Sequence, residues 1–215
     1  FKGVSKDEPD RRSGFAHLYE HLMFMGTNRV PNGDFDRLME AAGAQNNAST
    51  AEDRTNYYSS GPSNTLPLLL YLDADRLEDL GRAMTKEKVV LQREVVLNER
   101  RQTTENTPYG KAYEAIPSLM FPKGHPYSWS VIGSPADLNA AQVEDVKAFF
   151  ATYYVPRNAS LVVAGDFDPK EIKPLIAQWY GTLPGGKPVP RRAVPKLVPL
   201  GIKRVTIPDQ VTAPK

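Results

Sequence analysis

The chain has 215 residues, which is enough for one large domain or two small ones with a substantial core. Its 27 basic and 25 acidic side chains leave a net charge of +2, which gives no support for a nucleic-acid or membrane-surface partner. The longest apolar runs fall well short of the ~20 residues that a membrane-spanning helix needs. Because the chain contains no cysteine, a metal site would have to use histidine, aspartate or glutamate.

The sequence predicts helices that alternate with a few short strands. We expect helices over about 14–25, 34–44, 63–82, 85–106, 135–154 and 168–183, with Ser13 as the N-cap of the first. The segments NNAST, RTNYYSSG and ASLVVAGDF read as strands, the last most clearly. This alternation predicts an α+β or mixed α/β domain with long helices on a modest sheet.

Neither end of the sequence reads as a natural terminus, because the start has no methionine and no signal-peptide layout. We therefore expect a segment of a longer protein. From Leu183 onward the chain is rich in proline, which predicts an extended connector. We place one domain at residues 1–182, with its N-terminal edge truncated. Residues 183–215 would then be a connector and the start of a following strand or domain.

The stretch GFAHLYEHLMFMGT contains two of the three histidines in the chain. His17 and His21 are four residues apart and so share one helix face, and Glu20 reaches the same side. Two imidazoles and a carboxylate suit zinc, which lowers the pKa of bound water to about 7, and a nearby carboxylate can take that water's proton. The order His-x-x-Glu-His is the inverzincin signature. The alternative is a pair of histidines packed at a helix surface, and a third protein ligand would decide between the two.

A later helix, VVLQREVVLNERRQ, offers two glutamates as the third ligand. At 100° per residue, Gln92, Val95, Val96 and Glu99 form one stripe, whereas Glu94 points about 140° away from Glu99. The valines mark the buried side of the helix. Glu99 is therefore the better candidate, because a carboxylate on an apolar face is costly unless it is paired or binds a metal. The alternative is that Glu99 pairs with an arginine.

Together these motifs resemble the pitrilysin, insulin-degrading-enzyme and mitochondrial-processing-peptidase family of zinc metallopeptidases. GFAHLYEHLMFMGT is followed in family order by NNASTAEDRTNYY, REVVLNERRQ, HPYSWSVIGSPADL and NASLVVAGDFDP, so the resemblance extends to about residue 180. It implies the N-terminal, zinc-bearing half of the family, with one Zn2+ per chain. The implied ligands are His17, His21 and Glu99, and Glu20 is the implied general base. The implied fold is of the α+β class, the metallopeptidase α/β roll, with an antiparallel-rich sheet and long helices packed on it.

The resemblance also implies roles around the metal. The family commonly has a second glutamate at the position that Gln92 occupies here. Gln92 would therefore support the zinc ligands without binding the metal itself. Asn47, Ala48 and Ser49 would lie on the edge strand that pairs with peptide substrates by β-augmentation, unless this is an ordinary edge strand. For His125, in the proline-bounded loop KGHPYSW, we expect a structural role.

The implied activity is that of a zinc metalloendopeptidase acting on extended or unfolded peptides, with water activated by zinc and Glu20. A homologous second half, in the same chain or in a partner subunit, would be needed for full activity. The alternatives are a structural or chamber-closing subunit of a paired peptidase and a small-molecule zinc hydrolase. The segment NASTAEDRTNYY resembles exported bacterial members, which favours a periplasmic or other extracytoplasmic location over the cytoplasm.

Overall fold

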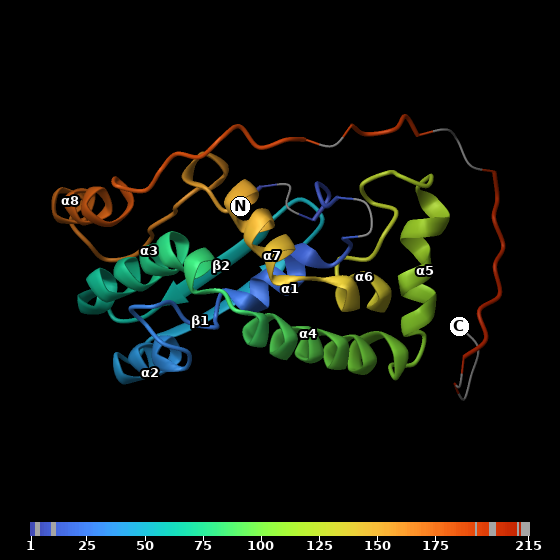
Figure 1. The fold of residues 1–215 in the computed structure, drawn as a ribbon, viewed down its shortest axis with the longest axis horizontal. Coiled ribbons are helices and arrows are strands. Elements are labelled where there is room, and N and C mark those ends of the chain that lie inside the picture. The colour runs from blue at the N-terminus through green and yellow to red at the C-terminus, as the bar shows by residue number, and fades with distance from the viewer. Residues whose placement is uncertain (3–4, 10–11, 192, 198–200, 210, 212–215) are drawn as a thin grey trace.

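Eight α-helices and one antiparallel strand pair make up the part of the chain that the structure, a computed structural model, describes (Figure 1). That part comprises residues 1–2, 5–9, 12–191, 193–197, 201–209 and 211. The helices are α1 (Phe15–Leu22), α2 (Asp34–Ala41), α3 (Leu66–Ala83), α4 (Lys86–Arg100), α5 (Gly110–Met120), α6 (Pro135–Ala140), α7 (Val143–Tyr153) and α8 (Pro169–Tyr180). The strands are β1 (Gln45–Thr50) and β2 (Thr55–Ser60). This composition confirms the predicted α+β class.

Three short helical turns complete the description. They lie at Ser63–Thr65, Pro156–Asn158 and Arg101–Glu105, the last being a π-helical continuation of α4. This continuation explains why the sequence pattern indicated one helix from 85 to 106. The Thr85 side chain accepts a hydrogen bond from the Lys88 amide and so caps the start of α4.

The main core lies where α1 packs against α4 and α7. Aromatic and aliphatic side chains from α1, α3, α4, α6 and α7 fill it, among them Phe15, Leu18, Tyr19, Leu22, Leu80, Val89, Val96, Leu138, Phe149 and Tyr153. A smaller cluster joins α2 to α3 through Val30, Phe35, Met39, Leu69 and Leu72. Because α1 is enclosed by other elements, its position is fixed by packing rather than by its own short length.

β1 and β2 pair antiparallel from Gln45↔Ser60 to Thr50↔Thr55. The third predicted strand, ASLVVAGDF at residues 159–167, is wrong in the described structure, which assigns no strand there. The apolar run is present, but a strand also needs a hydrogen-bonding neighbour, and residues 160–167 make no backbone hydrogen bond to any described residue. Val162 is accordingly 83% exposed.

After α8 the chain continues as an extended tail, drawn in orange and red, that runs the length of the molecule and passes α5 (Figure 1). Within the described residues of 183–215 there is no helix or strand. Arg191 binds Asp7 at 2.6 Å, and Lys203 donates to the carbonyl oxygen of Leu119 at 3.0 Å. The division at residue 182 stays a prediction. No helix among the described residues is long and apolar enough to cross a membrane.

Candidate metal centre

The helix that carries both histidines is anchored at its first turn by a distant carboxylate. Gly14 takes the N-cap position of α1 with φ +86° and contributes no side-chain cap. Glu8 supplies it instead: Oε1 accepts from the Ala16 amide at 2.8 Å, and Oε2 accepts from the Gly14 amide at 3.2 Å. The Trp129 indole also donates to Glu8, at 3.0 Å. Burial raises the pKa of Glu8 to about 8, although the two amides and the indole act in the opposite direction.

The prediction of Ser13 as the N-cap of α1 is wrong. Its amide and hydroxyl both donate to Asp137, and its hydroxyl accepts from the Ser134 amide. Ser13 therefore ties α1 to the start of α6. Glu8 was missed because it caps from six residues before Gly14, a spacing that no local capping pattern predicts.

α1 places His17 and His21 one turn apart, with their ring centroids separated by 4.8 Å. Both Nε2 atoms face Oε2 of Glu99 on α4, at 3.7 Å from His17 and 3.2 Å from His21. One ligand atom from each of the three residues lies within 4.8 Å of the others. Nitrogen and oxygen ligands about 2.0–2.2 Å from a tetrahedral zinc ion lie roughly 3.3 Å apart. The three side chains therefore fit a zinc ion.

The protonation state of His17 also fits a metal. Burial, followed by the neighbouring His21, lowers the pKa of His17 to about 4, so that this imidazole is neutral at pH 7. Neutral imidazole is the form that binds metal ions. Two imidazoles and one carboxylate form a donor set typical of catalytic zinc, which leaves a position open for water.

The packing of α4 turns Glu99 toward the histidines. Val96, one turn earlier, is completely buried against the core, and the Glu99 side chain is only partly exposed. Glu94 is more exposed and lies 3.8 Å from Arg93. The buried stripe is narrower than the sequence indicated, because Val95 is 40% exposed. In the described structure the ion pairs of Glu99 are to the two histidines, and none is to an arginine.

Glu20 lies on α1 between the histidines in sequence and is 9% exposed. Its Oε2 accepts a hydrogen bond from the Thr50 hydroxyl at the end of β1. Burial raises the pKa of Glu20, and the Thr50 hydrogen bond and His21 oppose that rise. The candidate base is therefore held beside the candidate metal ligands by a hydrogen bond from the strand pair.

The residues predicted to bind substrate lie on β1, which leads directly to Thr50. β1 pairs with β2 on one side, and its other edge is uncovered in the described part of the molecule. Asn47 and Ser49 are exposed and Ala48 is half-buried. The Ala48 amide donates to Oδ1 of Asn47 at 2.8 Å, so a side chain occupies this backbone donor.

Gln92 and His125, which the sequence also singled out, make contacts with other residues. Gln92 on α4 donates to Sδ of Met25 at 2.8 Å, and its support of the metal ligands stays a prediction. His125 is 4% exposed and stacks on Phe121 with ring centroids 4.6 Å apart, while Nδ1 accepts from the Tyr127 amide. These contacts agree with the structural role expected for His125.

Comparison with known families identifies two matching segments. Residues 3–125 match the family described as Insulinase (Peptidase family M16), and residues 140–214 match the one described as Peptidase M16 inactive domain. His17, Glu20, His21 and Glu99 all lie in the first segment.

Individual relatives of the chain are also described as proteases. The chain is 32% identical over 195 residues to zinc protease PqqE of Helicobacter pylori, covering 91% of this chain and 43% of that protein. The crystal structure of a protease from Helicobacter pylori superimposes with a TM-score of 0.83 at 31% identity, covering 88% of this chain and 45% of that one. The periplasmic protease PqqL of Escherichia coli superimposes with a TM-score of 0.76 at 26% identity, covering 89% of this chain and 21% of that one. The chain thus spans less than half the length of these relatives.

Proposed function

Because the chain belongs to the insulinase family of peptidases, family M16, we propose that it is the zinc-bearing part of a metalloendopeptidase that hydrolyses extended or unfolded peptides. The observation that carries the proposal is the convergence of His17, His21 and Glu99 on one point, next to a buried Glu20. The naming of its relatives as zinc proteases supports the choice of metal and of reaction. The presence of a single cluster of this kind among the described residues supports a stoichiometry of one zinc ion per chain.

Each side chain of the cluster has a distinct role in this chemistry. His17, His21 and Glu99 would hold the ion, which when bound supplies a Lewis acid that lowers the pKa of a water molecule to about 7. Glu20 would act as the general base, taking a proton from water and passing it to the leaving amine. The Thr50 hydroxyl donates to one oxygen of the Glu20 carboxylate and thereby orients it. The other carboxylate oxygen remains available for the proton.

An extended substrate would pair with the uncovered edge of β1. Neighbouring residues of a strand direct their backbone groups to opposite edges. The Ala51 amide donates to the Arg54 carbonyl, so Ser49 and Asn47 pair with β2, whereas Ala48 and Thr50 face the free edge. A peptide bound there would lie next to Thr50, whose hydroxyl donates a hydrogen bond to Glu20. Its carbonyl oxygen would replace Oδ1 of Asn47 as the acceptor of the Ala48 amide.

Full activity would require a second homologous half, in the same chain or as a partner subunit. The chain spans less than half of its relatives, and holding a peptide across the metal needs contacts from both sides. A purely structural, chamber-closing role is disfavoured because all four metal-site residues are present. A small-molecule hydrolase is disfavoured by the open strand edge beside Glu20. The periplasmic relative supports an extracytoplasmic location in a bacterium.

The proposal is tested by Glu20→Gln in the zinc-loaded protein together with its second half. Glutamine keeps the shape of the side chain and can still accept from Thr50, but it cannot take a proton at neutral pH. Hydrolysis of a quenched peptide should fall at least ~10²-fold while zinc stays bound. The matched control is Glu94→Gln on the outer face of α4, which should leave turnover unchanged. If Glu20→Gln kept near-parental turnover with zinc bound, the assignment of Glu20 as the general base would be wrong.

A further inference from the structure

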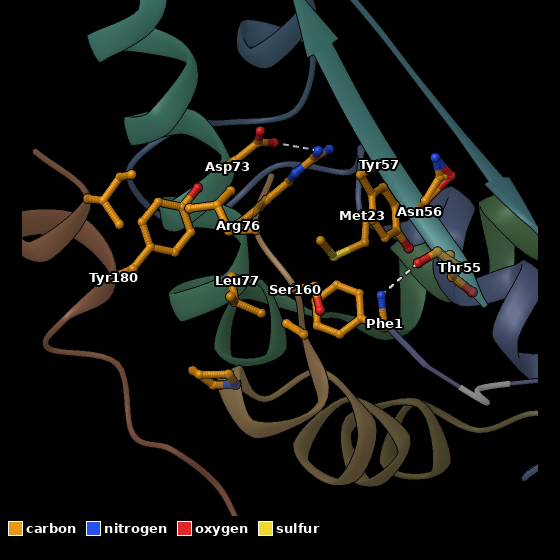
Figure 2. Close-up of a pocket in the computed structure, with 14 residues that line it drawn as sticks. Phe1, Met23, Thr55, Asn56, Tyr57, Asp73, Arg76, Leu77, Ser160 and Tyr180 are labelled. Carbon is orange, nitrogen blue, oxygen red and sulfur yellow. Dashed lines mark hydrogen bonds and ion pairs between the residues drawn. The ribbon is translucent and has the colours of Figure 1, made fainter. Parts of the chain in front are cut away.

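Three side chains of the strand pair point to the same face of the sheet. Thr50 and Thr55 are direct partners in the register, and Tyr57 follows Thr55 by two residues, so all three share one face. The Ala51 amide donates to the Arg54 carbonyl, so the next pair, Thr50 and Thr55, is not joined by backbone hydrogen bonds. In such a pair the side chains approach most closely. Figure 2 shows Thr55 and Tyr57 on β2.

The hydroxyl groups of these residues form a continuous series of contacts that ends at Glu20. Thr50 donates to Oε2 of Glu20, and its Oγ1 lies 3.2 Å from that of Thr55. Thr55 shares a hydrogen bond with the Tyr154 hydroxyl, which lies 2.8 Å from the hydroxyl of Tyr57. Thr55 is completely buried and Tyr154 is 2% exposed, so the middle of the series is shielded from solvent.

Each hydroxyl has a single proton, and this fixes the direction of the hydrogen bonds. An ionised Glu20 can only accept, so Thr50 gives its proton to Glu20 and must accept from Thr55. Thr55 has then used its own proton and accepts from Tyr154, which in turn accepts from Tyr57. Four donors therefore point the same way, toward the candidate base. We call these four groups the hydroxyl chain.

Opposite charges at the two ends of the hydroxyl chain favour this direction. The Arg76 guanidinium on α3 is buried and lies over the Tyr57 ring, 4.9 Å from its centroid, and Glu20 lies at the other end (Figure 2). The aligned hydroxyls direct their oxygens toward Arg76 and their protons toward Glu20, which is the favourable orientation of dipoles between such charges. Burial raises the pKa of both Tyr57 and Tyr154 above its ordinary value, so both hydroxyls keep the proton that they donate.

We propose that Thr55, Tyr154 and Tyr57 are positioning residues for Glu20 and act on it through Thr50. This inference rests on the function proposed above, in which Glu20 is the general base. A hydroxyl rotates about its C–O bond, so the Thr50 proton is free to turn from Glu20 to Thr55 unless Thr55 itself donates to Thr50. The bond from Tyr154 holds the Thr55 hydroxyl in that donating orientation. The arrangement persists during turnover, because the proton from water arrives on the other oxygen of Glu20.

The test measures kcat and KM for a quenched peptide in the zinc-loaded protein together with its second half. Tyr154→Phe and Thr55→Val each remove one hydroxyl and keep the shape of the side chain. Each should lower kcat at least about threefold, the loss expected for one weakened hydrogen bond, and leave KM and zinc content unchanged. Thr55→Ser keeps the hydroxyl and should recover most of the loss.

The matched control is Tyr153→Phe. Tyr153 is next to Tyr154 in the sequence and is 5% exposed, but its hydroxyl donates to the Asp7 carbonyl at 2.9 Å, outside the hydroxyl chain. This variant should keep parental kcat. The double variant Thr55→Val/Tyr154→Phe should lose no more kcat than the more severe single variant, because both changes interrupt the same chain.

Three kinetic results would overturn the proposal. The first is parental kcat in both Tyr154→Phe and Thr55→Val. The second is an equal loss in Tyr153→Phe and Tyr154→Phe, because the effect would then be one of packing. The third is a loss in the double variant equal to the product of the two single losses.

A second measurement does not depend on hydrolysis. In the same assembly without zinc, the NMR resonance of the Thr50 hydroxyl proton reports its hydrogen bond to Glu20. Tyr154→Phe should move this resonance upfield, because hydrogen bonds in series strengthen one another, and Tyr153→Phe should leave it in place. An unchanged resonance in Tyr154→Phe would overturn the hydroxyl chain whether or not the parent is active. The expected shift in a protein that hydrolyses no peptide would instead refute the proposed function and retain the chain.

Discussion

Replacing Val96 by alanine should destabilise the protein far more than the same change at Val95. The two residues are adjacent on α4, but Val96 is completely buried against α1 and its neighbours, whereas Val95 is 40% exposed. Each buried methyl group contributes ~0.8 kcal/mol by transfer, and the cavity left behind adds to this. We expect Val96→Ala to cost roughly 2–3 kcal/mol of unfolding free energy and Val95→Ala less than about 1 kcal/mol.

The assay is equilibrium urea unfolding with a chelator present, so that zinc binding does not contribute to the measured stability. The m-value should be the same for both variants, which would show that the change lies in the folded core. The comparison matters for the metal centre because the burial of Val96 turns Glu99, one turn later, toward α1. Equal losses at the two positions would refute the helix orientation on which the position of Glu99 depends.

Three further predictions concern the surroundings of the site. Thr50→Val should raise the pKa of Glu20 in the zinc-free protein, because it removes a hydrogen bond to the carboxylate, whereas Thr50→Ser should not; carboxyl NMR titration measures both. Glu8 has a folded-state pKa raised from 4.5 to about 8, so its stabilising contribution is complete below pH 4.5 and is lost as the pH rises toward 8. Unfolding between pH 5 and 9 should show this loss, and Glu8→Gln should flatten it. Finally, the chain alone should bind zinc but should hydrolyse a quenched peptide at least ~10²-fold more slowly than with its second half added, because groups that stabilise the oxyanion would be missing. Equal kcat/KM values would show a self-sufficient peptidase.

The proximity of His17, His21 and Glu99 was predictable because helical spacing places these residues on defined faces. His17 and His21 are four residues apart, and the apolar positions of α4 separate Glu99 from Glu94 without any knowledge of the fold. The predicted direction of the Glu99 side chain on α4 agrees with the structure, even though Val95 is more exposed than the pattern suggested. Local periodicity thus specifies a site when its residues lie on two helices whose buried faces are clear.

Interactions between distant segments were not predictable in the same way. Glu8 caps α1 across a loop, and Ser13, the expected cap, instead binds Asp137, 124 residues away. The segment at 159–167 has the composition of a strand, but strand formation depends on a neighbour, and the described structure provides none. Composition reports what a segment can form, whereas pairing depends on what lies beside it.

The central claim is that His17, His21 and Glu99 bind one zinc ion, and the zinc dissociation constant of three proteins tests it most directly. Competition with a chromophoric chelator would compare the parent chain, Glu99→Gln and Glu94→Gln. The parent and Glu94→Gln should bind one equivalent with equal affinity, and Glu99→Gln should bind at least roughly tenfold more weakly, since losing a ligand should cost no less than losing one of the outer groups that support it. Loss of zinc from Glu94→Gln with tight binding retained in Glu99→Gln would contradict the claim.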